Sequence, residues 1–310
     1  MISLPFSANF WRHLAVAIIS LSGAVAAHAQ IEVDLALPRR AYILYEPVIA
    51  KITVTNNTGH EVTLEDIGGK QWFNLDVTRL DGGIVQPYDT DYKLRPLTIH
   101  AGETLNRQID LTPLFPIRER GTHRVRANIY YPEADKFFYS NFATFELTDG
   151  KLLWRQNVGS PTDVGSTRQV SLLTHTLLDK MLLYVRVRDE NGNNVYTTQS
   201  IGRVIVSGRE PQEYFDRDNV LHVLHESFPG TYLYTEINMD GERVNQLAYL
   251  RVGTSRPFLV KTAAGNVEVH GGQLQAPRVA GESDAPTKLS ARPKGLPASP
   301  GGEYQNKGGR

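Results

Sequence analysis

Apolar and polar side chains alternate at every second position along much of the first half of this 310-residue chain. In residues 48–55, Ile52 and Val54 share one face, whereas Thr53 points to the other. Because successive side chains of a strand point to opposite faces, this period predicts half-buried β-strands, and helical periodicity is weak throughout. The alternation recurs, between turn-forming clusters, in residues 73–78, 105–111, 125–129 and 143–147. We therefore predict an antiparallel β-sandwich over residues 30–148.

Four turn and strand motifs follow one another in this first segment. They are Tyr45-Glu46-Pro47-Val48, Asn56-Asn57-Thr58-Gly59, Ala101-Gly102-Glu103-Thr104 and residues 121–125. Their order resembles the layout of bacterial Ig-like modules of the BsuPI-like type, although Tyr45 stands where Gly is usual. The resemblance covers only this segment and implies an Ig-like scaffold. Its motifs mark turns and strand starts and contain no catalytic residues, so the resemblance implies little about function.

The second segment also reads as strands. Residues 181–199 form a hairpin pattern, and residues 219–251 a three-stranded meander that reverses at Pro229-Gly230 and Asp240-Gly241. The meander resembles one propeller blade, but the segment is too short for the four blades that a propeller needs. We predict a second, smaller β domain over residues 149–272, as a small sheet or a second sandwich. Beyond it, residues 273–310 are rich in Gly and Pro, which predicts a disordered tail.

The N-terminus has the pattern of a secretory signal peptide. Arg12 precedes an apolar run that ends in Ala27-His28-Ala29, where small residues suit signal peptidase. We predict removal of residues 1–29, cleavage after Ala29 and a periplasmic or extracellular location. The run is too short for a membrane anchor, and no later segment reaches transmembrane length. An export signal in a chain without cysteine fits a bacterial envelope best, so the sequon at Asn56 is interpreted as a turn.

Composition and missing motifs exclude several classes of function. The 33 basic and 33 acidic residues balance, and no basic patch indicates binding to nucleic acid. The absence of cysteine removes disulfides, thiolate metal sites and cysteine nucleophiles. The sequence contains no nucleophile elbow of the G-x-S-x-G type, no phosphate-binding glycine loop and no dinucleotide fingerprint. We predict no cofactor and no catalytic residues.

Two further patterns are weak candidates for metal binding. His222 and His225 lie three residues apart in a strand, which points their rings to opposite faces, so we expect ordinary sheet residues. The acidic segments 189–194 and 216–219 carry oxygen ligands, but the first departs from calcium-loop spacing. We expect polar turns in both. Whether these loops bind a cation stays open, and the sequence predicts no metal site.

Aromatic side chains are the remaining candidates for a binding site. Five lie close together in what reads as a loop between the last two strands of the first domain, and a tryptophan follows the domain junction. Aromatic residues on sandwich loops commonly contact ligands or proteins. The alternative is that they cover the sandwich or the interface between the domains. The candidates are Tyr130, Tyr131, Phe137, Phe138, Tyr139 and Trp154.

These observations favour an exported, non-catalytic binding or scaffolding protein of the bacterial cell envelope, with an envelope protein or a polysaccharide as its partner. Two alternatives stay open. A proteinase-inhibitor-like module would need a projecting loop, for which residues 111–120 are the best candidate. A carbohydrate-active enzyme would need acids from separated strands, such as Asp216, Asp218 or Glu226.

Overall fold

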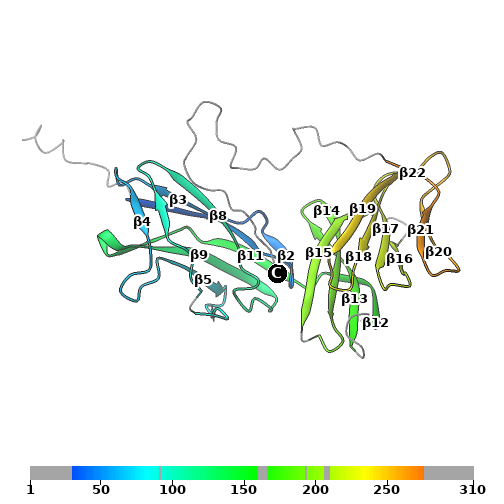
Figure 1. The fold of residues 1–310 in the computed structure, drawn as a ribbon, viewed down its shortest axis with the longest axis horizontal. Helices are drawn as coiled ribbons and strands as arrows, with labels where there is room; N and C mark the ends of the chain where they lie inside the picture. Colours follow the sequence, from blue (N-terminus) through cyan, green and yellow to red (C-terminus); the bar gives the residue numbers. More distant parts are fainter. Residues whose placement is uncertain (1–29, 91, 160–165, 193, 206–209, 276–310) are drawn as a thin grey trace, which may run out of the picture.

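A computed structural model describes residues 30–90, 92–159, 166–192, 194–205 and 210–275 (Figure 1). The predicted signal peptide and residues 276–310 of the predicted tail lie outside these ranges. The described chain is all-β and forms several sheets whose strands are antiparallel except for one pair, with a single turn of 3-10 helix at Pro132–Ala134. None of its described segments forms an apolar helix of membrane-spanning length.

The first β body consists of two main sheets and a small ribbon. One sheet has the order β1 (Ile31–Ala36), β3 (Ile49–Asn56), β8 (Thr104–Asp110). The opposite sheet has the order β2 (Ala41–Ile43), β11 (Ala143–Thr148), β9 (Gly121–Tyr131), β5 (Phe73–Arg79), β6 (Ile84–Val85), and β10 (Lys136–Tyr139) pairs with β9. The ribbon joins β4 (Val62–Leu64) and β7 (Leu97–Ile99). The pair β2–β11 is parallel, whereas the other pairs are antiparallel.

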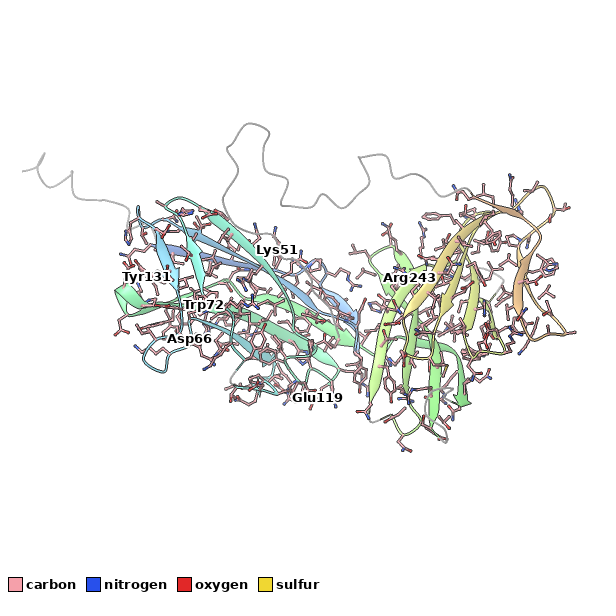
Figure 2. All side chains as sticks on the ribbon, in the orientation of Figure 1. Lys51, Asp66, Trp72, Glu119, Tyr131 and Arg243 are labelled. Atoms are coloured by element: carbon pink, nitrogen blue, oxygen red, sulfur yellow. The ribbon has the colours of Figure 1, made fainter. Side chains whose placement is uncertain are left out.

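The core of this sandwich lies where the alternation places it. In β3 every second residue is buried, and Ile52 and Val54 belong to a cluster that also contains Leu75 and Phe145 from the opposite sheet. Trp72, labelled in Figure 2, is almost completely buried in the same cluster. The predicted β-sandwich is therefore confirmed, since alternate side chains of both sheets fill one core.

Tyr45 adopts an uncommon backbone conformation in the turn between β2 and β3. Its φ of 68° lies in the left-handed region, which a residue without Cβ enters most easily. The turn is closed by the Glu46 N–H, which donates to the carbonyl oxygen of Ile43 at 3.1 Å. The conformation thus explains why glycine suits this position, where the chain carries tyrosine instead.

The second β body is also a sandwich. Its first sheet has the order β12 (Lys151–Gly159), β13 (Thr167–Leu177), β14 (Lys180–Asp189), β15 (Val195–Arg203). Its second has the order β16 (Gln212–Phe215), β17 (Leu221–Phe228), β18 (Thr231–Ile237), β19 (Arg243–Leu250), β22 (Gln273–Leu274). The hairpin of β20 (Phe258–Lys261) and β21 (Val267–His270) contributes to a smaller apolar cluster on the outer face of the second sheet. Since β22 pairs with β19, this body extends to residue 275, beyond the predicted boundary at 272.

A small joint connects the two bodies. Ile43 from the first packs with Leu173 and Tyr184 from the second in a separate apolar cluster. The guanidinium of Arg186 donates to the carbonyl oxygen of Leu44 at 2.7 Å. Both sides of the joint are therefore buried, and a bond to a charged donor fixes their contact.

Candidate ligand-binding face

Three of the predicted aromatic residues gather on the outer face of the first sandwich. Strands β9 and β10 form a hairpin in which Phe137 pairs with Tyr130. The two rings lie 5.0 Å apart, and those of Phe137 and Tyr139 lie 6.4 Å apart and are stacked. The hydroxyl of Tyr130 donates to the Asp135 carboxylate at 2.7 Å. These residues therefore belong to paired strands, where the sequence predicted a loop.

The other three predicted aromatic residues lie in the interior. Tyr131 is buried in the core of the first sandwich, and Phe138 packs against the same core. Trp154 packs against the core of the second sandwich, with its ring 6.1 Å from that of Phe215. The alternation explains the separation of neighbours such as Tyr130 and Tyr131, because adjacent side chains of a strand face opposite ways. Tyr131, Phe138 and Trp154 therefore fill cores, and Trp154 does not pack in the joint as expected.

An arginine lies between exposed rings at the centre of the outer face. The Arg126 guanidinium carbon is 4.5 Å from the ring centroid of Tyr139 and 5.0 Å from that of Phe142. Its Nε donates to the Asp76 carboxylate of the neighbouring strand at 2.8 Å. The stacked cation covers part of each ring and holds both in place, so the face offers rigid aromatic surfaces beside a fixed pair of charges.

Asp76, Arg126 and Phe142 line one wall of a groove of about 470 Å³, and Tyr139 lies beside it. We use the name aromatic groove for the hollow bounded by Asn74, Asp76, Arg126, Phe142, Tyr88 and Tyr92, among other residues. The segment between β6 and β7 forms the opposite wall and supplies the last two rings. Its volume lies within the usual range of about 300–1,000 Å³ for small-molecule sites.

The segment that walls the aromatic groove is held by hydrogen bonds from the sandwich. The indole N–H of Trp72 donates to the carbonyl oxygen of Leu94 at 3.2 Å, and the amide of Gln71 donates to the carbonyl oxygen of Thr90 at 3.1 Å. The Tyr88 N–H donates to the carbonyl oxygen of Leu114 at 2.9 Å. A buried side chain thus anchors the wall, so the groove is largely formed before any ligand arrives.

Several buried polar atoms on the same outer face have no hydrogen-bond partner. They are the Thr78 hydroxyl, the Arg124 Nε and the Asn128 Oδ1, none of which is paired within the part of the chain that the structure describes. Thr78 and Arg124 are opposite each other in the β5–β9 register. An unpaired buried polar atom costs about 1–3 kcal/mol. The outer face thus carries three polar groups whose hydrogen-bonding capacity the described part of the fold does not use.

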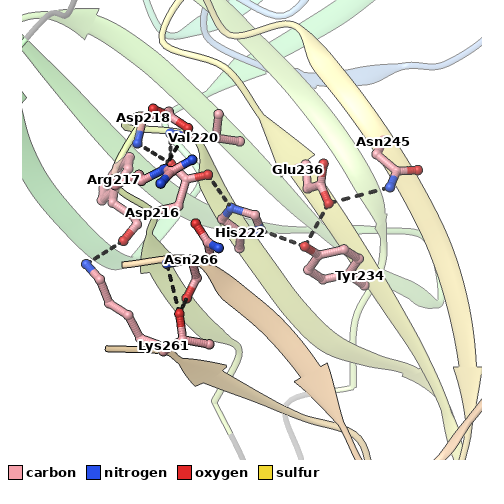
Figure 3. Close-up of polar contacts among 12 residues, drawn as sticks. Asp216, Arg217, Asp218, Val220, His222, Tyr234, Glu236, Asn245, Lys261 and Asn266 are labelled. Carbon is pink, nitrogen blue, oxygen red and sulfur yellow. Dashed lines mark hydrogen bonds and ion pairs between the residues drawn. The ribbon is translucent and has the colours of Figure 1, made fainter. Parts of the chain in front are cut away.

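A chain of polar contacts runs through the second sandwich (Figure 3). The hydroxyl of Tyr234 donates its one proton to Glu236 Oε1 at 2.7 Å, so its oxygen accepts from His222 Nδ1 at 2.6 Å. The other ring nitrogen, Nε2, lies 3.1 Å from Asp216 Oδ2. The His222 ring therefore bridges Tyr234 and Asp216.

The surroundings of Tyr234 and Asp216 shift the pKa values of both side chains. Burial and the neighbouring Glu236 raise the pKa of Tyr234 well above its usual value, so its hydroxyl keeps the proton. Burial opposes the charge of Asp216, but the bonds from His222 and from backbone N–H groups outweigh it and lower the pKa of that carboxyl. Tyr234 and His222 are only 5% and 6% exposed, which leaves a substrate no access to them. The contacts therefore tie β16, β17 and β18 together and do not form a catalytic triad.

The predicted metal candidates do not converge. His225 lies on the opposite face of β17 from His222, as predicted, and its Nε2 donates to the carbonyl oxygen of Arg203 at 3.1 Å. Asp216 Oδ1 accepts the backbone N–H groups of Asp218 and Val220, as in a polar turn. Among the described residues, no three His, Asp or Glu side chains are grouped so that they could hold a metal ion.

The candidate inhibitor loop is packed against the sandwich. Leu111, Phe115 and Ile117 are buried, and Leu114 packs against the same core. A projecting loop complementary to a protease cleft would expose these apolar side chains. The segment 111–120 therefore supports the wall of the aromatic groove and lacks the shape that inhibition needs.

Three exposed rings at this site were not among the predicted residues. Phe142 lies in the connection between β10 and β11, and Tyr88 and Tyr92 lie in the segment between β6 and β7. Tyr88 and Tyr92 stand in a polar stretch of sequence, where composition gives no cluster, whereas Phe142 lies only three residues after Tyr139. Only the pairing of β5 with β9 brings these segments together.

Comparisons with known proteins leave the family open. No family model matches the chain, and no curated protein matches its sequence. Among solved structures, the chain is similar to Spo0M, a sporulation control protein from Bacillus subtilis, at 12% identity over 56% of this chain and 91% of that chain. The TM-score is 0.27, so this likeness carries no argument about function.

Proposed function

We propose that this protein is an exported, non-catalytic binding protein of the bacterial cell envelope and that it binds a polysaccharide in the aromatic groove. The observation that carries the proposal is that Phe142, Arg126 and its ion-pair partner Asp76 line one preformed groove, with Tyr139 stacked on the other side of the guanidinium. Sugar rings offer apolar C–H faces that stack on aromatic rings, and hydroxyls that both donate and accept hydrogen bonds. Exposed rings flanked by fixed polar groups suit both features.

The polar part of the groove favours a glycan over an apolar peptide. Asn74 and Asp76 project from β5 on the same face as Arg126 from β9, which places acceptors and donors side by side. A sugar hydroxyl can bond to both kinds of group, whereas an apolar side chain would leave them unpaired at a cost. A protein partner is the outcome that the experiment below must exclude.

The acids considered for an enzyme have structural partners, which supports a non-catalytic role. Asp216 is bound by His222, and Glu226 Oε1 accepts the N–H of Gly230 in the turn between β17 and β18 at 2.8 Å. Within the aromatic groove, Asp76 forms an ion pair with Arg126. Each of these carboxylates therefore serves a contact within the fold.

We also propose that the first sandwich is Ig-like. The early strands divide between the sheets: β1 pairs with β3, and β2 pairs in parallel with β11. The remaining order, β11-β9-β5-β6 facing β1-β3-β8, supports a Greek-key sandwich of this type. Ig-like scaffolds present binding surfaces in many proteins, which agrees with a binding role but does not identify a ligand.

The test uses residues 30–310 and a panel of purified envelope polysaccharides, with binding measured by affinity electrophoresis and calorimetry. We expect Phe142→Ala to weaken binding about tenfold, as removal of a central aromatic anchor does. The matched control is Phe258→Ala, because Phe142 and Phe258 are both 47% exposed but lie in different sandwiches. Equal binding by the two variants would exclude this face. Binding to envelope proteins alone would replace the glycan with a protein partner.

A further inference from the structure

A second hollow adjoins the aromatic groove on the far side of Phe142. It has a volume of about 560 Å³ and lies between β11 and the segment that follows β1. Phe142 lines both hollows, so a ligand that extends from one hollow into the other passes over this ring. Each hollow alone has the size of a small-molecule site. Two such sites in a row suit a linear polymer better than a single compact molecule.

Guanidinium groups dominate the charge beside Phe142. Arg40 is exposed and lines the second hollow, and the Arg124 guanidinium carbon lies 5.2 Å from the Phe142 ring centroid. Neither arginine forms an ion pair within the described ranges. Among the described residues, Glu146 is the one acidic side chain that lines this hollow. We use the name basic hollow for this site, because two arginines without an ion pair, Arg40 in its lining and Arg124 beside Phe142, outnumber its carboxylate.

Arg39 also lines the basic hollow, but its charge is already balanced. Its guanidinium forms an ion pair with the buried Glu46 carboxylate at 2.7 Å and donates to the Tyr184 hydroxyl at 3.2 Å. The free positive charge therefore lies at Arg40 and Arg124. An arginine presents paired N–H donors that match a carboxylate, so these two positions favour acidic groups on a ligand.

We propose that the ligand is an acidic polysaccharide chain that crosses Phe142. Its sugar rings occupy the aromatic groove, and its carboxylates meet Arg40 in the basic hollow and Arg124 beside Phe142. This inference rests on the proposed glycan-binding function and adds to it the charge of the glycan and the path of the chain. The exposed ring of Phe142 serves as a ridge on which one sugar stacks, and the two hollows accept the residues on either side.

The test uses residues 30–310 and oligomers of a linear uronic acid, from dimer to octamer, each paired with its methyl ester. Calorimetry at low salt gives the dissociation constants. We expect affinity to rise about tenfold or more once an oligomer is long enough to reach the basic hollow, and then to level off. Methyl esterification removes the charge but keeps the backbone, and we expect it to weaken binding of the long oligomers about fivefold. Raising the salt to about 0.5 M should reduce this difference.

The matched variants are Arg40→Gln and Arg155→Gln, since both arginines are exposed and Arg155 lies on β12 of the second sandwich. We expect Arg40→Gln to remove most of the preference for the acid without changing binding of the ester, and Arg155→Gln to change neither. Equal binding of acid and ester overturns this inference but leaves glycan binding intact. Affinity that is independent of length overturns the path across Phe142. Failure of every oligomer to bind in either form overturns this inference, whereas the proposed function falls only if the polysaccharide panel also shows no binding.

Discussion

His225 should make the second sandwich sensitive to acid. Its ring is 2% exposed, and its Nε2 N–H donates to the carbonyl oxygen of Arg203 at 3.1 Å. The other nitrogen, Nδ1, is buried and has no partner within the described residues. A second proton would therefore place an unpaired charge in the interior. Burial lowers the pKa of His225 from 6.5 to about 4, although the bond to Arg203 opposes this.

The size and sign of the effect follow from this difference. The unfolded chain binds the proton more tightly than the folded chain, so His225 contributes stability that is complete above pH 6.5 and is lost as the pH falls toward about 4. At about 1.4 kcal/mol per pH unit, the difference corresponds to about 3 kcal/mol. Below pH 4 the contribution is exhausted.

The measurement compares the native chain with His225→Gln. Glutamine keeps an N–H donor for the Arg203 carbonyl but does not titrate. Between pH 7.5 and pH 4, the free energy of unfolding of the second sandwich, measured with urea, should fall by about 3 kcal/mol less in the variant than in the native chain. His270→Gln is the control, because its ring is half exposed in the same sandwich. The reasoning is refuted if both variants keep the native slope, or if NMR titration gives His225 in the folded chain a pKa near 6.5.

Three further predictions concern stability. Trp72→Ala should lower the free energy of unfolding by about 3–5 kcal/mol, because it empties a core position and releases the groove wall, as denaturant titration and hydrogen exchange of that segment would show. Tyr234→Phe should cost about 1–3 kcal/mol in chemical denaturation, since it removes the hydroxyl that His222 and Glu236 share. Arg186→Met should loosen the joint, so that limited proteolysis near residues 148–151 is faster while the far-ultraviolet circular dichroism spectrum is unchanged.

Strands with one buried face could be read from the sequence. Residues 48–55 alternate cleanly, and β3 occupies almost the same positions. The dipeptides Pro229-Gly230 and Asp240-Gly241 lie between the strands β17, β18 and β19 of the predicted meander. In these cases the local chemistry is sufficient, because one face meets the core and the turns need residues that tolerate positive φ.

Strands without a clear polar face were missed. β13 has buried side chains on both faces between Val170 and Thr174, so no two-residue period is visible there. β12 has the opposite character, with few buried residues on either face. The run Ile129–Tyr131 is buried throughout, which made the hairpin look like an aromatic loop. A two-residue period reveals a strand only when one of its faces is buried and the other exposed. It is absent where both faces have the same environment.

The candidate site could be predicted only in part for a different reason. Tyr130, Phe137 and Tyr139 are close in sequence, so local composition alone predicted them as candidate binding residues. These three residues do not line the aromatic groove itself. Its lining includes Asp76 and Phe142, which lie on separate strands and connections and meet only through the pairing of β5, β9 and β11. Long-range pairing of this kind leaves no local signal in a single sequence.

The joint between the sandwiches determines which arginine can serve a ligand. Glu46 is buried, and its ion pair with Arg39 would leave an uncompensated carboxylate if an acidic ligand drew the arginine away, at a cost of about 3–5 kcal/mol. An exposed contact between a ligand carboxylate and an arginine contributes at most about 1 kcal/mol. Arg39 should therefore stay with Glu46, and Arg39→Gln should lower the unfolding free energy without changing acid preference. Arg40 is exposed and has no such partner, so we expect the ligand's carboxylate to bind Arg40. This contact leaves the joint between the sandwiches intact.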